Sequence, residues 1–76
     1  MREQEIVEVL RVENPEFQQL EQEHRALESR LSELESKHFL KPEEEMEIKL
    51  IKKQKLAKKD KMAMLIRQYK KTVLQN

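Results

Sequence analysis

The chain has 76 residues, 41% of them charged, and it contains no glycine and no cysteine. This length allows one small domain, residues 1–76, and the lack of cysteine excludes a disulfide framework. The 16 Lys and Arg residues against 15 Asp and Glu leave a net charge of +1, so the long-range field is weak. A composition rich in Glu, Lys, Leu and Gln, with few aromatic residues, favours an all-α fold.

The same composition also bears on where the protein is found in the cell and on whether it is an enzyme. No segment approaches the roughly 20 consecutive apolar residues of a membrane span, and the first residues lack the apolar run of a secretory signal. With no cysteine present, these features predict a cytoplasmic protein. There is no glycine-rich phosphate loop, no cysteine nucleophile and no set of residues at metal-ligand spacing, so the sequence predicts neither an enzyme nor a cofactor nor a bound metal.

The first predicted element is a short helix over residues 2–13, on which Ile6, Val9 and Leu10 share a face. It ends at Asn14-Pro15, because the residue before a proline avoids the helical region. Asn is a favoured N-cap and Pro is favoured just inside a helix, so a second helix is predicted to start here and run over residues 15–37.

The second helix carries a seam of residues separated alternately by three and four positions. The seam consists of Phe17, Leu20, His24, Leu27, Leu31, Leu34 and His38. This heptad spacing predicts an apolar face that another helix must cover, since such a helix is unstable alone in water.

Residues 38–41 are predicted to be a connection, and Pro42 to open a third helix over residues 42–73. Phe39 and Leu40 are expected to fold back over the end of the resulting hairpin. A single continuous helix in a parallel dimer is the alternative. Beyond residue 41, however, the seam meets mostly charged positions, and Pro42 lies at the break, so an antiparallel coiled-coil-like hairpin is favoured.

The third helix has two apolar lines. The primary stripe comprises Ile48, Ile51, Met62, Leu65, Ile66, Tyr69 and Val73. A weaker line nearly opposite comprises Met46, Leu50, Ala57 and Met64. The stripe and the seam together give the predicted core: Phe17, Leu20, His24, Leu27, Leu31, Leu34, Ile48, Ile51, Met62, Leu65 and Tyr69. The weaker line is a candidate self-association face, although isolated exposed apolar residues are also common.

Charge is divided between the two halves of the chain. Residues 1–45 carry a net charge of −7 and residues 46–76 a net charge of +8. An acidic helix folded against a basic one is complementary, and this arrangement sets orientation more than stability, because exposed ion pairs contribute little.

His24 lies in the middle of the seam and admits a functional or a structural interpretation. A metal ligand or a proton switch is one possibility, but His38 is about 21 Å away along a helix, so the two cannot share a metal. In a hairpin turned near residue 40, His24 faces Leu56 and lies beside Lys55. A polar layer that fixes the register of the helices is the simpler prediction.

The lysine-rich run over residues 52–61 also has two interpretations. It pairs with the acidic helix and presents a solvated face, or it binds nucleic acid or an anionic membrane surface, with Lys52, Lys53 and Lys59 as candidate contacts. Only one arginine, Arg67, lies in the basic half, and no aromatic side chain is interleaved with the run to stack on bases. The first interpretation is therefore favoured.

The order of these residues resembles the YdcH-like family of small bacterial proteins, a domain of unknown function. In the first half, the motif is Asn14-Pro15, Phe17, Leu20, His24, Leu27, Leu31 and Leu34. In the second half, it is Glu47-Ile48, Ile51-Lys52-Lys53-Gln54-Lys55-Leu56, Lys59-Asp60 and Met62. The resemblance implies a cytoplasmic helical hairpin with self-association and no established activity. The family usually has an apolar residue at Lys58, an acid at Lys61 and a Gly/Asp-rich hairpin loop.

Taken together, the sequence predicts a short leader helix and an antiparallel helical hairpin that dimerises into a bundle. About fourteen apolar side chains make a thin core, which is one reason to expect self-association. The predicted role is protein–protein interaction or scaffolding as a homodimer, with an unknown protein partner possible. Nucleic-acid binding by the basic helix is the alternative.

Overall fold

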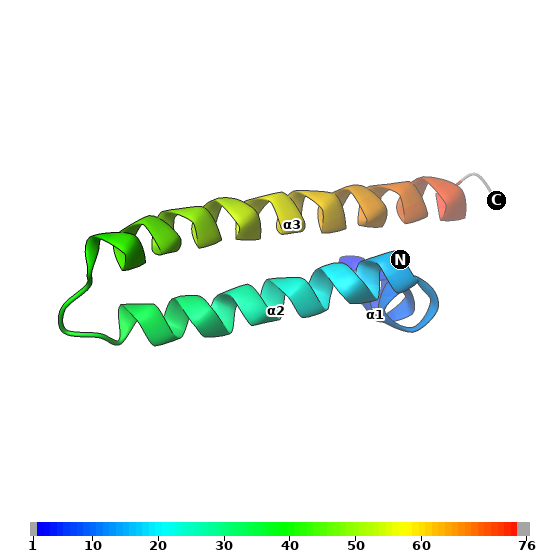
Figure 1. Cartoon of the computed structure of the whole chain (residues 1–76). Helices are drawn as coiled ribbons and strands as arrows, with labels where there is room; N and C mark the ends of the chain where they lie inside the picture. Colours follow the sequence, from blue (N-terminus) through cyan, green and yellow to red (C-terminus); the bar gives the residue numbers. More distant parts are fainter. Residues whose placement is uncertain (1, 75–76) are drawn as a thin grey trace.

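The computed structural model describes residues 2–74, and these form three α-helices (Figure 1). They are α1 (Glu3–Glu13), α2 (Pro15–Glu35) and α3 (Pro42–Leu74). Helices α2 and α3 run antiparallel, and α1 packs against both of them at the open end of the hairpin. No strand occurs in this part of the chain, so the all-α hairpin predicted from the sequence is confirmed.

Helix α2 begins where the sequence predicts and ends earlier. The Asn14 side chain accepts a hydrogen bond from the Phe17 N–H at 3.0 Å, as an N-cap does, and Pro15 occupies the first turn. The helix stops at Glu35, one or two residues before the predicted end near Ser36 or Lys37. At this end of the helix, the Ser36 hydroxyl donates a hydrogen bond to the Glu33 carbonyl at 2.7 Å.

Helix α3 begins at Pro42 through a reciprocal cap. The Lys41 carbonyl accepts hydrogen bonds from the N–H groups of Glu44 and Glu45, and the Glu44 carboxylate accepts from the Lys41 N–H at 3.0 Å. Lys37 also contacts the Glu44 carboxylate. These polar contacts close the end of the hairpin.

The expectation that Phe39 folds back over this end is wrong. Its side chain is 91% exposed, whereas Leu40 is half-buried. The loop end of the core is filled by Leu34 and Ile51, and the polar contacts of Glu44 hold the connection. The Phe39 ring is therefore left in solvent.

The core forms two separate clusters. At the open end of the hairpin, the buried residues are Ile6, Leu10 and Phe17, with Val7, Met62, Leu65, Ile66 and Tyr69 packed against them. At the loop end, the buried residues are Leu31, Leu34 and Ile51, with Leu27 and Ile48 packed against them. Each cluster joins α3 to a different part of the acidic half of the chain.

Helix α1 has a clear structural reason to fold back. Helix α3 has 33 residues and α2 has 21, so α3 is longer by about 18 Å at 1.5 Å per residue. Its C-terminal part therefore needs a second partner, which Ile6 and Leu10 supply. Arg11 fixes the corner between α1 and α2 through an ion pair with Glu21 at 2.8 Å.

Candidate interaction surface

The residues predicted to form the core all lie on the inner sides of the hairpin helices. Five are buried: Phe17, Leu20, Leu31, Leu34 and Ile51. Six are half-buried: His24, Leu27, Ile48, Met62, Leu65 and Tyr69. Ile6 and Leu10 were absent from the predicted core, yet they are 0% and 4% exposed. A signal was present, because the predicted third helix was already longer than the second and left apolar residues uncovered.

A polar layer separates the two core clusters. The His24 Nδ1 atom lies 3.9 Å from the Glu28 carboxylate, and its Nε2 atom is buried without a hydrogen-bond partner. Lys55 pairs with Glu28 at 3.4 Å, and Lys58 pairs with Glu23 at 3.3 Å. Both lysines are half-buried, so their stems cover the middle of the hairpin while their ammonium groups meet carboxylates.

Leu56 does not face His24 as the sequence predicted. Its side chain is 61% exposed. Successive residues on a helix are 100° apart, so inward-facing Lys55 turns Leu56 toward the flank of α3.

The lysine-rich run divides into two groups. Lys55 and Lys58 face α2, and Lys52 approaches Glu35 at 3.9 Å. Lys53 and Lys59 are exposed and make no ion pair within residues 2–74. Part of the run is thus the basic partner of the acidic helix, and the rest faces solvent.

The predicted self-association face lies on the outer side of α3. Met46 is 71% exposed, Leu50 54% and Met64 45%, and Ala57 is also exposed. The buried Ile51 lies on the opposite side of the same helix. The outer side of α3 thus carries an apolar line that no described residue covers.

Near the loop end, charged side chains tie α2 to α3. Arg30 donates two hydrogen bonds to the Glu47 carboxylate, from Nε at 2.7 Å and from Nη2 at 3.0 Å, and a third to Glu33 at 3.3 Å. The bond from Arg30 holds the pKa of the Glu47 carboxyl below its ordinary value. Lys37 and the Lys41 N–H lower the pKa of Glu44 in the same way. These pairs fix the helix register at the loop end.

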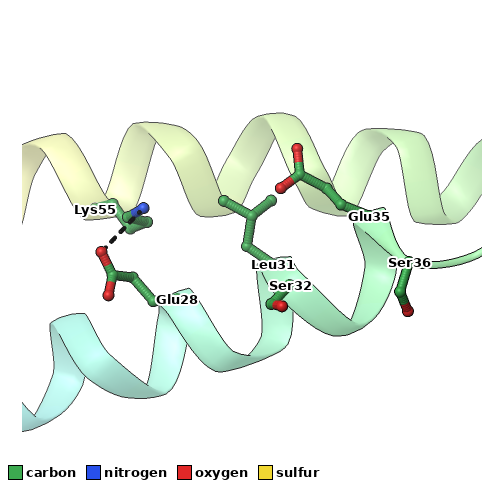
Figure 2. A pocket seen from close by; sticks show the side chains of 6 residues that line it. All are labelled: Glu28, Leu31, Ser32, Glu35, Ser36 and Lys55. Carbon is green, nitrogen blue, oxygen red and sulfur yellow. Dashed lines mark ion pairs between the residues drawn. The ribbon is translucent and has the colours of Figure 1, made fainter.

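A shallow hollow lies between α2 and α3. Figure 2 shows its lining residues: Glu28, Leu31, Ser32, Glu35, Ser36 and Lys55. Leu31 points toward α3, whereas Ser32 and Ser36 point away from it. Of the charged groups here, Glu28 pairs with Lys55 and Glu35 lies 3.9 Å from Lys52, and the Ser36 hydroxyl already donates to a backbone carbonyl. The hollow therefore presents carboxylates that face lysines and no nucleophile held by a base.

The described part of the chain has neither a cluster of metal ligands nor a membrane-spanning helix. Within residues 2–74, no group of three or more His, Asp and Glu side chains is arranged to hold a metal ion. Over the same residues, no helix combines the length and apolar character needed to cross a membrane.

The fold and surface define a small helical hairpin whose long third helix carries an uncovered apolar line. Residues 17–66 match the family described as Protein of unknown function (DUF465). Because the match spans more than half of the chain, the protein belongs to this family, consistent with its resemblance to the YdcH-like proteins. No curated protein and no solved structure matches the chain.

Proposed function

We propose that this protein is a non-catalytic interaction module whose docking surface is the outer side of α3. The observation that carries the proposal is the exposure of Met46, Leu50 and Met64 along one line of a single helix. An aligned row of exposed apolar side chains is typical of a helix that packs against another helix.

A second copy of the chain is the partner that we infer. The intramolecular core is confined to two small clusters, so burial of additional apolar surface between copies would add to stability. The absence of cysteine suits a module that works in the bacterial cytoplasm.

Sedimentation of the wild-type chain and of Leu50→Asp tests this proposal. The wild type is expected to show a concentration-dependent monomer–dimer equilibrium. Leu50→Asp is expected to shift it to monomer while circular dichroism shows unchanged helicity, because Leu50 lies outside both core clusters. Phe39→Asp is the matched control, since it places the same charge at an apolar residue that is 91% exposed in the connection. A wild-type chain that stays monomeric into the high micromolar range would refute the proposal.

Polyanion binding is a second candidate, favoured by one observation. Lys52, Lys55 and Lys59 line a small hollow on α3 together with Leu56, and Lys59 makes no ion pair within residues 2–74. The ammonium groups of Lys59 and of the equally exposed Lys53 are thus free to contact phosphates, and such binding would weaken steeply with salt. A mobility-shift assay at low salt with Lys52→Glu and Lys59→Glu tests it, and the absence of any shift with the wild type would exclude it.

A further inference from the structure

The apolar line on α3 belongs to a longer regular pattern. Positions 46, 50, 53, 57, 60 and 64 are separated by alternating steps of four and three, the spacing of a heptad seam. We name this set the outer seam; it consists of Met46, Leu50, Lys53, Ala57, Asp60 and Met64. Only Lys53 and Asp60 interrupt its apolar character.

Asp60 is an acidic residue in a part of α3 whose other residues are mostly basic or apolar. It is the only acid in α3 after Glu47, and every other charged residue of the helix beyond Glu47 is basic. Positions three and four residues away from Asp60 are all apolar: Leu56, Ala57, Ala63 and Met64. The helix therefore offers this carboxylate no partner at the spacings where side chains meet.

Lys53 likewise has no oppositely charged neighbour three or four residues away on the helix. Its neighbours at three and four residues are Lys49, Leu50, Leu56 and Ala57, none of them acidic. No ion pair to Lys53 or to Asp60 occurs within residues 2–74. The outer seam therefore carries one unpaired charge of each sign, on either side of Ala57.

We propose that two copies of the chain pair antiparallel along the outer seam, with the twofold axis close to Ala57. This proposal rests on the proposed function and adds to it a geometry and a register. Lys53 of each copy then lies beside Asp60 of the other, and Leu50 of each lies beside Met64. Ala57 is small, so the two helices can approach closely at the axis.

Charge selects the antiparallel orientation. A parallel pair would place Lys53 beside Lys53 and Asp60 beside Asp60, and like charges opposite one another are unfavourable. It would also place the acidic start of α3, residues 43–45, beside itself. The antiparallel pair instead brings that acidic start near the basic end of the other α3, which carries Arg67, Lys70 and Lys71.

The fold leaves room for this pairing. Ala57 lies next to the midpoint of α3, so helices related by an axis there overlap along nearly their full length. The residues that α3 uses inside the hairpin, such as Ile51 and Tyr69, lie on its other side. Dimerisation thus requires no rearrangement of the hairpin.

The predicted register, with Lys53 of one copy beside Asp60 of the other, can be tested by reversing the charge at each position and measuring self-association by sedimentation. Lys53→Asp and Asp60→Lys are each expected to weaken self-association roughly tenfold or more, because each creates two like-charge contacts per dimer. The double variant keeps the wild-type composition and is expected to restore the dimer. A mixture of the two single variants is expected to form a heterodimer more readily than either forms a homodimer. Lys59→Asp, the same charge change away from the seam, is the control.

Cysteine cross-linking tests the orientation, and the natural chain has no cysteine to interfere. Ala57→Cys is expected to form a disulfide-linked dimer. Met46→Cys is not, because its two copies would lie about 33 Å apart along the pair. Efficient cross-linking through Met46→Cys would indicate a parallel pair and overturn the inference.

The outcomes also separate this inference from the proposed function. A dimer that Leu50→Asp dissociates, but that is indifferent to Lys53→Asp and Asp60→Lys, would overturn the register and leave the docking surface in place. A wild-type chain with no self-association would overturn both.

Discussion

His24 places a buried ring nitrogen between the two core clusters, and the fold supplies that atom with no partner. A buried polar atom without a hydrogen bond costs free energy relative to water. The surrounding pairs, Lys55–Glu28 and Lys58–Glu23, are satisfied. His24 therefore lowers stability in the middle of the hairpin, at the level where a polar layer separates the two core clusters.

Replacement of this residue by an apolar one should stabilise the protein. His24→Leu is expected to raise the free energy of unfolding by about 1–3 kcal/mol, because it removes the unsatisfied nitrogen and adds apolar contact. Urea denaturation at constant protein concentration measures this change. His38→Leu, in the exposed connection, is the control and should leave the midpoint nearly unchanged. A destabilised His24→Leu variant would mean that the ring makes a favourable interaction.

Glu47 gives a prediction for the dependence of stability on pH. Its pKa is lower in the folded chain than the ordinary 4.5, so its contribution is present above that value and is lost as the pH falls through the folded pKa. Glu47→Gln should therefore lose less stability than the wild type between about pH 7 and about pH 3. Thermal melts across this range measure the difference. Glu45→Gln, an exposed carboxylate outside the described ion pairs, should follow the wild-type profile.

At the scale of elements, α1 is a structural part of the hairpin and not an appendage. Ile6 is fully buried and packs in one cluster with Phe17 of α2 and residues of the C-terminal part of α3. Helix α1 has 11 residues, too few for stability alone in water, so this packing is what holds it in place. The helix and the cluster it covers depend on each other.

A truncated side chain in α1 should therefore destabilise the whole molecule. Ile6→Ala is expected to cost about 2–5 kcal/mol, the range for a large-to-small substitution in a core. Val12→Ala, in the same helix but 78% exposed, should change stability little. Urea denaturation followed by circular dichroism gives both values. A loss confined to the signal of one short helix would show that α1 unfolds independently.

The start of a helix can be predicted from the sequence where the capping residue and the proline that follows it determine the start. Asn14 with Pro15 and Lys41 with Pro42 begin helices through caps that depend on adjacent residues, so the starts of α2 and α3 were predictable. The end of α2 at Glu35 coincides with no proline or glycine, and the hydrophobic periodicity does not encode it. The position of α1 was missed because Ile6 meets its partners on α3 only after the hairpin has closed.

The candidate surface on α3 was predictable where it depends only on the geometry of a single helix. The outward position of Leu50 and Met64 follows from the 100° helical step once Ile51 is placed inside. Leu56 was misplaced because the relative register of two helices depends on their packing, which put Lys55 and Lys58 in the central layer. Phe39 shows that an apolar residue in a connection need not join the core.

At the scale of the whole molecule, the protein is a rod, 54 Å long and 19 Å by 17 Å across its Cα atoms. Helices α2 and α3 run along the length of this rod, and the side of α3 that faces away from α2 forms one of its long sides (Figure 1). A contact along this side and a contact between the ends of two rods would give assemblies of very different shape.

Small-angle X-ray scattering distinguishes these assemblies. Pairing along α3 is expected to double the mass while the maximum dimension increases by far less than the 54 Å length of one chain. End-to-end association would nearly double that dimension. The monomeric Leu50→Asp variant supplies the reference curve for a single rod, and a particle twice as long would contradict pairing along α3.

The cluster at the open end also has a consequence for biosynthesis. Ile6 and Leu10 emerge from the ribosome before Met62 and Tyr69, because they precede them in the chain. The growing polypeptide therefore keeps the apolar side of α1 exposed until the C-terminal part of α3 has been made. A product released before Met62 would still display that apolar side, which is the kind of signal that chaperones and proteases recognise. An interrupted molecule would thus be marked by its exposed α1, although the part that it lacks belongs to α3.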